Sequence, residues 1–293
     1  MSRIIGPVDF QRITLVGVGL LGGSIGLAAK QRSVAGRVIG YVRRAESVEE
    51  CLENGAVDEA TQDLEAAVTG ASLVILCTPV GQMCELAKRI KPYLSADAVI
   101  TDVGSVKRSV VREVEPVLSR FVGSHPLCGS EKAGVVHARG DLLEGAVCAV
   151  TPTDSTNADA LELVTQFWEA LGSRVVSLSA GAHDTIVART SHLPHVLATT
   201  LVNTVLGQLR GGEAAFLGTG FHDTTRLASG SPELWRDIAL TNAEAIAASI
   251  DGVQNELEEL QAALRTGNAA QLEAFFSKGQ MRRDDWLKGL EKE

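Results

Sequence analysis

Three glycines near the start of the chain have the G-x-G-x-x-G spacing of a phosphate-binding turn: Gly17, Gly19 and Gly22. They follow the apolar run 13–16, which is typical of a buried strand, and overlap a helical pattern over 20–30. In such a turn the first glycine permits a tight bend, the second lets the backbone approach a pyrophosphate, and the third lets helix and strand pack closely. The phosphates then bind the free N–H groups that begin the helix, here those of Leu20 and Leu21. The spacing therefore predicts a dinucleotide site, with an ordinary tight turn as the alternative.

The residues after the second expected strand bear on which dinucleotide binds. NAD-binding chains usually carry Asp or Glu about 20 residues beyond the last glycine, where it bonds the ribose 2′-hydroxyl. This chain has Val42 there, followed by Arg43 and Arg44. Guanidinium groups bind a 2′-phosphate bidentately, so we expect both arginines to contact the cofactor, with NADP favoured and NAD still usable. The alternatives are a solvated strand end or a ribose contact from Glu46.

Two further motifs stand where buried strands are expected to end. Thr78 and Pro79 follow the strand 72–77, and Ser105 follows the strand 98–103. Ligands of open α/β sheets bind beyond the carboxyl ends of the strands, so we expect Thr78 and Pro79 beside the ribose or nicotinamide of the cofactor. Ser105 should face the same crevice. The structural alternatives are helix N-caps at Thr78 and at Ser105.

One histidine is placed for proton transfer. His125 lies just past the expected strand 120–123 and is followed by Pro126. An unperturbed pKa of about 6.5 suits a general base near neutrality. A lone histidine is more often structural than catalytic, but a position beyond a strand end favours catalysis. A nucleophilic pair of His125 with Cys128 is the less favoured alternative.

The C-terminal half adds polar candidates. His192 and His195 are three residues apart on one expected helical face, with Pro194 between them. No glutamate stands between them as in the H-E-x-x-H zinc motif, and we expect no metal site. Asp223 and Arg226 suit either a surface salt bridge or an arginine that binds a carboxylate and is held by its acidic partner.

The elements around these residues predict an α/β fold followed by a helical domain. Up to about residue 179, strand-like and helix-like runs alternate, which predicts a doubly wound sheet of the Rossmann type. The expected strands are 12–16, 37–42, 72–77, 98–103 and 120–123, with 146–150 and 174–176 as an extension whose antiparallel direction is left open. The expected helices between them are 20–30, 46–53, 64–68, 80–90, 107–118 and 158–171.

Strand signals end near residue 180, so we expect domains at 1–179 and 180–293, the second one all-helical. Its expected helices are 182–209, 232–253, 253–265 and 269–290. The helix around 191–209 is apolar on nearly every side, which is typical of a helix buried all round. In a domain of this size that favours a subunit interface, most simply in a symmetric homodimer.

Composition narrows the class of protein. The 293 residues are 45% hydrophobic and 22% charged, as in soluble globular proteins, and allow two domains. A net charge of −9 argues against nucleic acid or an anionic membrane as partner. The sequence has no apolar run of 18 residues and no secretory signal, so we expect a cytoplasmic location. The five cysteines form no C-x-x-C pair, and we expect them to be reduced.

Together these motifs resemble the prephenate/arogenate dehydrogenase family, the cyclohexadienyl dehydrogenases of tyrosine biosynthesis. The matching segments are 17–24, 77–80, 101–107, 125–131, 191–195, 220–226 and 234–237. The first motif occurs in many families, but the ordered ensemble is specific. The resemblance implies a Rossmann domain followed by an all-helical dimerisation domain.

The resemblance also implies a reaction. His125 matches the histidine that accepts the proton of the ring 4-hydroxyl, while hydride passes to NAD(P) and the ring carboxylate leaves as CO2. The product is 4-hydroxyphenylpyruvate from prephenate or tyrosine from arogenate. Ser105 matches a serine that bonds near that hydroxyl and the nicotinamide.

The remaining matches concern substrate binding. Arg226 matches the arginine that binds a substrate carboxylate, and His195 and Glu131 match residues around the side-chain end, where we also place Ser130. The sequence leaves prephenate and arogenate undecided. Rival interpretations are a dehydrogenase of β-hydroxyacids or imino acids, which would typically use a lysine, and a non-catalytic NADP sensor, which need not keep these residues together.

Overall fold

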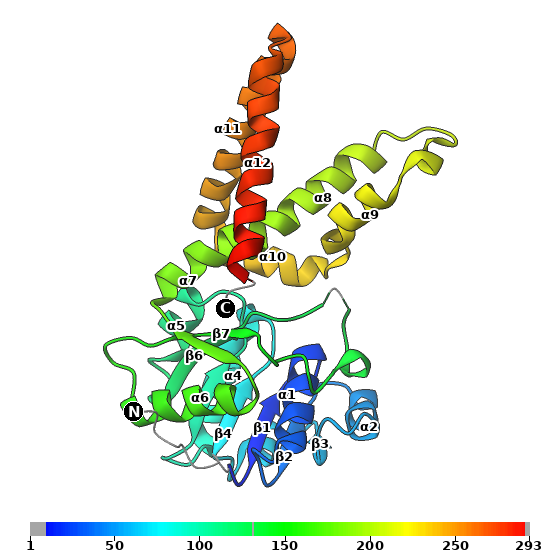
Figure 1. The fold of residues 1–293 in the computed structure, drawn as a ribbon. Coiled ribbons are helices and arrows are strands. Elements are labelled where there is room, and N and C mark those ends of the chain that lie inside the picture. The colour runs from blue at the N-terminus through cyan, green and yellow to red at the C-terminus, as the bar shows by residue number, and fades with distance from the viewer. Residues whose placement is uncertain (1–9, 131, 291–293) are drawn as a thin grey trace. The chain divides into compact units, whose positions relative to one another are not determined.

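The computed structural model describes residues 10–130 and 132–290. Its internal contacts divide the chain into two compact units, Met1–Ala243 and Glu244–Glu293, which are described separately. The first unit contains an eight-stranded sheet with helices on both faces (Figure 1). The strands are β1 (Ile13–Val16), β2 (Val38–Tyr41), β3 (Glu59–Thr61), β4 (Leu73–Leu76), β5 (Val99–Asp102), β6 (Phe121–Pro126), β7 (Val147–Thr151) and β8 (Arg174–Ser177).

The strand order is β3-β2-β1-β4-β5-β6-β7-β8, and the first six strands are parallel. β7 pairs antiparallel with β6, and β8 pairs parallel with β7. The expected doubly wound Rossmann-type sheet is confirmed. The order reverses between β1 and β4, and a cofactor binds at this switch point in such sheets.

Helices cover both faces of the sheet because successive side chains of its strands point to opposite faces. Ile13 and Leu15 pack in the core that α1 and α6 cover, whereas Val16 packs in the core under α3, α4 and α5. The helices of this part are α1 (Leu20–Gln31), α2 (Glu46–Glu53), α3 (Leu64–Val68), α4 (Val80–Ile90), α5 (Arg108–Val114) and α6 (Ala158–Ala170). Two short 3-10 turns, η1 (Lys91–Tyr93) and η2 (Val135–His137), accompany them.

After β8 the first unit is helical, as expected. Its elements are α7 (Ala180–Val187), the π-helical turn η3 (Ala188–His192), α8 (Leu193–Leu206), η4 (Glu213–Phe216), α9 (Thr219–Thr225), η5 (Arg226–Ser229) and α10 (Pro232–Thr241). The single helix expected over 182–209 was wrong, because the π turn divides it just before Pro194. The helix expected over 232–253 also ends early, at the C-cap Asn242.

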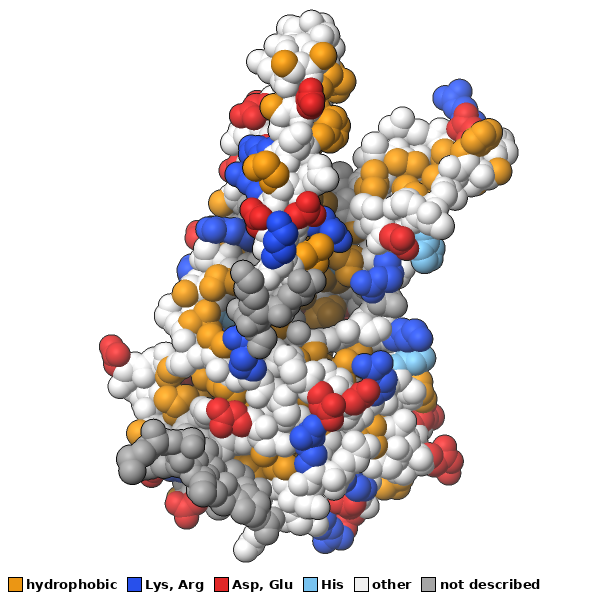
Figure 2. All heavy atoms as spheres, viewed as in Figure 1, with side chains coloured by type: hydrophobic (Ala, Val, Ile, Leu, Met, Phe, Trp, Pro, Cys, Tyr) orange, Lys and Arg blue, Asp and Glu red, His pale blue; other side chains and the backbone are white. Residues whose placement is uncertain are grey.

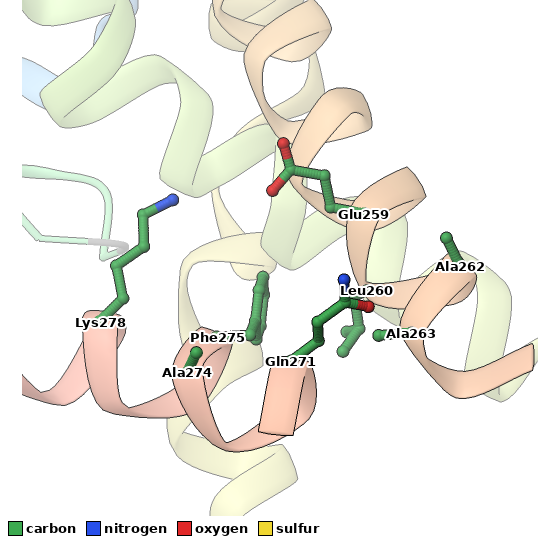
Figure 3. Close-up of a pocket in the computed structure, with 8 residues that line it drawn as sticks. All are labelled: Glu259, Leu260, Ala262, Ala263, Gln271, Ala274, Phe275 and Lys278. Atoms are coloured by element: carbon green, nitrogen blue, oxygen red, sulfur yellow. The ribbon is translucent and has the colours of Figure 1, made fainter. Parts of the chain in front are cut away.

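The second unit is a helical hairpin built from α11 (Ala243–Thr266) and α12 (Ala269–Leu290). Large hydrophobic side chains on it are exposed, among them Leu264, Phe276 and Trp286, and Figure 2 shows hydrophobic side chains along the hairpin. A groove of about 390 Å³ lies between the two helices, with Leu260 and Phe275 among its lining side chains (Figure 3). None of the described helices is long and apolar enough to span a membrane.

Candidate active site

The glycine turn has the geometry that phosphate binding requires. Gly17 has a φ of +102°, which L side chains rarely adopt, and a Cβ atom at Gly22 would lie 2.2 Å from the Gly17 carbonyl oxygen. Gly19 is the N-cap of α1, and a Cβ atom there would meet no described atom within 4 Å. The N–H groups of Leu20 and Leu21 begin the helix and are free to bind phosphate oxygens. A nucleotide pyrophosphate fits this turn.

A buried hydroxyl lies beside the turn without a partner. Thr78 follows β4, and its Oγ1 atom is buried with no hydrogen bond to any described residue. The Thr78 methyl carbon would lie 3.1 Å from a Cβ atom at Gly17, so the two residues adjoin. The N-cap of α4 is Pro79, so the alternative interpretation of Thr78 as an N-cap was wrong. An unpaired hydroxyl at this place fits a bound cofactor group.

The adenosine end of the expected site is exposed. Arg43 and Arg44 lie in the connection between β2 and α2. Arg44 donates a hydrogen bond to Ser47 Oγ at 3.1 Å and lies 3.8 Å from Glu50 Oε2. Glu46 is the first residue of α2. The two arginines and this glutamate therefore all follow the carboxyl end of β2.

His125 is buried in a chain of hydrogen bonds with two residues of α7. Its Nδ1 atom lies 2.9 Å from Nε2 of His183, and Nδ1 of His183 lies 2.8 Å from Oδ1 of Asp184. The expected strand end at Gly123 was wrong, because residues 123–126 pair antiparallel with β7 and extend β6 through His125. The strand itself therefore holds the histidine backbone.

Asp184 also ties α7 to α5. Its Oδ1 atom accepts a hydrogen bond from the backbone N–H of Lys107 at 2.7 Å, and its Oδ2 accepts one from that of Arg108 at 2.9 Å. The Asp184 carboxylate thus caps the N-terminus of α5, although the two are far apart in the sequence. Ser105 precedes this cap, since Lys107 is the N-cap residue, so the N-cap alternative for Ser105 was wrong.

Burial sets the protonation of this cluster. Burial, together with the charges of His183 and Lys107, holds the pKa of His125 well below its usual value, so the ring is neutral at pH 7. Burial alone would raise the pKa of Asp184, but the hydrogen bonds from His183 and from two backbone N–H groups outweigh it and lower that pKa. A neutral imidazole therefore stands in line with an ionised carboxylate.

A buried ion pair lies under the same edge of the sheet. The Lys107 ammonium contacts the Asp102 carboxylate and donates a hydrogen bond to the Ser124 carbonyl at 2.9 Å. Asp102 Oδ1 also accepts a hydrogen bond from the Ser124 backbone N–H at 3.0 Å. These contacts bind the end of β5 to the residue that precedes His125, and so fix the place of the imidazole.

A second buried cluster lies in the helical part of this unit. His195 is buried near the start of α8 and stacks on Trp235, with ring centroids 3.5 Å apart and planes 12° from parallel. A Cβ atom at Gly230 would lie 2.9 Å from His195 Cε1 and 2.6 Å from Trp235 Nε1. Arg226 begins η5, which packs on α8, the helix that carries His195, and its side chain is exposed.

The remaining predicted residues differ in placement. Ser105 is half-buried beyond β5, on the side of His192, whose pKa its backbone influences. Ser130 is exposed, and its Oγ accepts a hydrogen bond from the Lys132 backbone N–H at 3.1 Å. Glu131 lies outside the described residues. In the part of the chain that the structure describes, no three His, Cys, Asp or Glu side chains form a group that could hold a metal ion.

The sequence interpretation missed His183, Asp184 and Trp235. Trp235 lies in one of the matched motifs, so the signal for it was present. His183 and Asp184 lie on a short helix capped by Ser179, and their only signal was an adjacent histidine and aspartate at the domain boundary.

Two family models cover most of the chain. The model described as the nucleotide-binding domain of prephenate dehydrogenase matches residues 25–177, and the one described as its dimerization domain matches residues 179–278. A cyclohexadienyl dehydrogenase of Zymomonas mobilis is 33% identical over 279 residues, which are 94% of this chain and 95% of that protein.

Solved structures agree. Prephenate dehydrogenase from A. aeolicus, solved with hydroxyphenyl propionate and NAD+, is 34% identical with a TM-score of 0.88, and the match covers 94% of this chain and 98% of that one. Synechocystis arogenate dehydrogenase is 29% identical with a TM-score of 0.79, and the match covers 94% of this chain and all of that one (100%). The rival dehydrogenase and sensor interpretations are not favoured. The resemblance seen in the sequence is confirmed, and the chain belongs to the prephenate dehydrogenase family.

Proposed function

We propose that this protein oxidatively decarboxylates prephenate, arogenate or both, with a bound NAD(P) as the hydride acceptor. The observation that carries the proposal is the chain from His125 through His183 to Asp184, at the sheet edge that also bears the glycine turn. A base in line with a buried carboxylate suits a reaction that begins with removal of a hydroxyl proton. The relatives named above act on substrates of this kind.

The hydrogen bonds support one of the two ring nitrogens of His125 as the proposed base. The Asp184 carboxylate only accepts, so His183 carries its proton on Nδ1. When Nε2 of His183 is the acceptor, Nδ1–H of His125 donates to it. The lone pair of His125 is left on Nε2, where it takes the proton of the ring 4-hydroxyl. Asp184 balances, through His183, the charge that His125 gains.

We place the substrate carboxylate at Arg226, since a guanidinium binds a carboxylate bidentately. His195 borders the same end of the site through its stack on Trp235. We propose that Ser105 contacts the hydroxyl and the nicotinamide, and that Ser130 and Glu131 contact the side-chain end of the substrate. We also propose the division of the chain into domains at 1–179 and 180–293.

For the cofactor, we propose that NADP is preferred and that NAD is also used. The supporting feature is a pair of arginines, Arg43 and Arg44, after a strand end that carries Val42 in place of an acid. Gly17, Gly19 and Gly22 would hold the pyrophosphate, and Thr78 and Pro79 the ribose or nicotinamide. When bound, the cofactor supplies the acceptor for the hydride.

We propose a homodimer formed through the helical part. Leu197 and Leu206 of the apolar helix α8 are 40% and 45% exposed in the single chain, where a fully buried helix was expected. The model matched by this region is described as a dimerization domain. A second copy would cover this apolar surface.

The experiment that tests the activity is a steady-state assay of the purified protein with each combination of prephenate or arogenate and NAD or NADP. Formation of reduced nicotinamide is followed by absorbance and CO2 release is measured alongside it. Turnover in at least one combination, with one CO2 per reduced cofactor, supports the proposal. No turnover in all four combinations by a protein that still binds the cofactor would overturn it.

A further inference from the structure

His192 is a buried histidine that the proposed reaction does not use. It ends the π turn η3, and only 1% of its surface is exposed. Its Nε2 atom is buried and makes no hydrogen bond of normal geometry with any described residue. Buried polar atoms in folded proteins nearly always have a partner, so an unpaired ring nitrogen next to a candidate site points to a ligand.

The proton of this imidazole is located by its neighbours. Asn242 Nδ2 lies 2.9 Å from the backbone carbonyl oxygen of Asp184 and 3.2 Å from Nδ1 of His192. A carbonyl oxygen can only accept, so the atom that faces it must be the amide nitrogen, and the second N–H of that amide points at His192. Nδ1 of His192 is therefore the acceptor. The proton of the neutral ring is on Nε2, to which no described residue offers normal hydrogen-bond geometry, while the ring also interacts with the Ser105 backbone.

His192 stays neutral. Burial lowers its pKa to about 4, although the Asp184 carboxylate and the Ser105 backbone favour the protonated form, and the charges of His183 and His195 oppose it. At neutral pH the ring therefore offers an N–H donor without a positive charge. The donor is fixed in place, because Asn242 holds one side of the ring and Trp235 packs against it edge to face, with ring centroids 6.0 Å apart.

The neighbours of His192 place the ring in the same cluster as the candidate base. The ring lies beside the backbone of Ser105 and near enough to His125 for its charge to affect the pKa of that base. Asp184 links the two histidines, since its carboxylate binds His183 and its backbone carbonyl binds Asn242. Asp184 therefore orients both the proposed base, His125, and the hydrogen-bond donor, His192.

We propose that His192 Nε2–H donates a hydrogen bond to the ring oxygen from which His125 removes the proton, an inference that rests on the proposed function. Loss of that proton and of the hydride turns the C4 hydroxyl into a carbonyl. When the bond from C1 to the carboxylate then breaks, CO2 leaves and the electron pair moves through the ring to this oxygen, which becomes a phenolate and takes the proton back from His125. A preorganised donor stabilises the charge that develops on the oxygen.

The test compares two stable ligands that differ in this oxygen alone. Affinities for 3-(4-hydroxyphenyl)propionate and 3-phenylpropionate are measured by calorimetry, at saturating oxidised cofactor, for wild type, His192→Phe and His192→Gln. We expect the wild-type preference for the hydroxylated ligand to fall by about tenfold in His192→Phe and to be partly retained in His192→Gln, which keeps an N–H donor. The absorbance of the bound phenol should also show its ionisation moved to higher pH in His192→Phe.

Turnover gives an independent readout. We expect kcat to fall by roughly tenfold to a thousandfold in His192→Phe with little change in KM, because the donor acts mainly on the charge formed during reaction. An unchanged ratio of the two affinities in a folded His192→Phe variant would overturn the inference, while absence of turnover in the wild type would instead overturn the proposed function.

Discussion

The Nδ1 atom of His125, on β6, lies 2.9 Å from Nε2 of His183, on α7, across 58 residues of sequence. This contact joins the parallel-sheet part of the chain to its helical part at the imidazole for which proton transfer is proposed, through the ring nitrogen opposite the proposed base. It also orients the imidazole, because the ring can rotate only at the cost of a buried hydrogen bond. The geometry of the base therefore depends on how α7 is held.

Replacement of His125 by asparagine should remove the base and leave the fold intact. We expect His125→Asn to bind cofactor normally and to lose roughly 10² to 10⁴ in kcat. Because burial lowers the pKa of His125, the acid limb of the wild-type profile of kcat/KM should lie below the usual histidine range near pH 6.5. Turnover of the variant close to wild type, with cofactor affinity preserved, would show that another group accepts the proton.

Replacement of His183 should act through His125. In His183→Phe the ring volume is retained but Nδ1–H of His125 loses its acceptor, so we expect kcat to fall by roughly tenfold to a hundredfold with KM nearly unchanged. The matched control is His137→Phe, at an exposed position of η2. A proportional rise in KM, or an equal loss in the control, would indicate a general structural effect instead of a positioning role.

The local parts of this site were visible in the sequence, and the long-range parts were not. The turn at Gly17 and the strand before it could be predicted because they depend only on residues that are close in the sequence. His183 meets His125 on a helix that Asp184 ties to α5, and Asp184 is 77 positions from Lys107 and 76 from Arg108 in the sequence. No period or motif in one sequence encodes such a contact.

Two elements and one strand end were also not predicted from the sequence. β3 was not expected, because its three residues are partly exposed at the edge of the sheet and lack an apolar run. α9 was missed because its seven residues are mostly exposed and have no apolar face. β6 was expected to end at Gly123, since glycine and proline usually mark a strand end, but pairing with β7 carries it to Pro126.

Arg226 should contribute to binding more than to chemistry. A charge-assisted contact with a carboxylate contributes on the order of 1.5 to 3 kcal/mol, so we expect Arg226→Ala to raise KM for the substrate by roughly tenfold to a hundredfold. Since the carboxylate is bound before and during the reaction, kcat should change little. Arg112→Ala, at an exposed position of α5, is the control. An unaltered KM would assign Arg226 a structural role.

Arg43 should determine the preference for NADP. Its guanidinium can contact a 2′-phosphate that NAD lacks, so Arg43→Ala should lower kcat/KM for NADP and leave that for NAD almost unchanged. The measurement is the ratio of kcat/KM for the two cofactors in wild type and variant. If the wild type prefers NAD by tenfold or more, Glu46 takes over as the candidate ribose ligand and the arginines face solvent.

The free energy of unfolding should fall as the pH is lowered from about 6.5 to 4, and His192 should account for a measurable part of that decrease. Its pKa is about 4 in the folded chain and near 6.5 when unfolded, so the unfolded state takes up a proton first. The contribution of His192 to the free energy of unfolding is fully present above the pKa of the unfolded state. It is lost as the pH falls toward the pKa of the folded state, by about 2 kcal/mol between pH 7 and pH 5. Asp58 and Asp184, whose pKa values are lowered, lose their contributions to stability only below about pH 4.

The measurement is urea unfolding at fixed protein concentration. The free energy of unfolding should fall less between pH 7 and pH 5 for His192→Gln than for wild type or for His137→Phe. An equal loss in all three proteins would mean that His192 is not buried as a neutral ring.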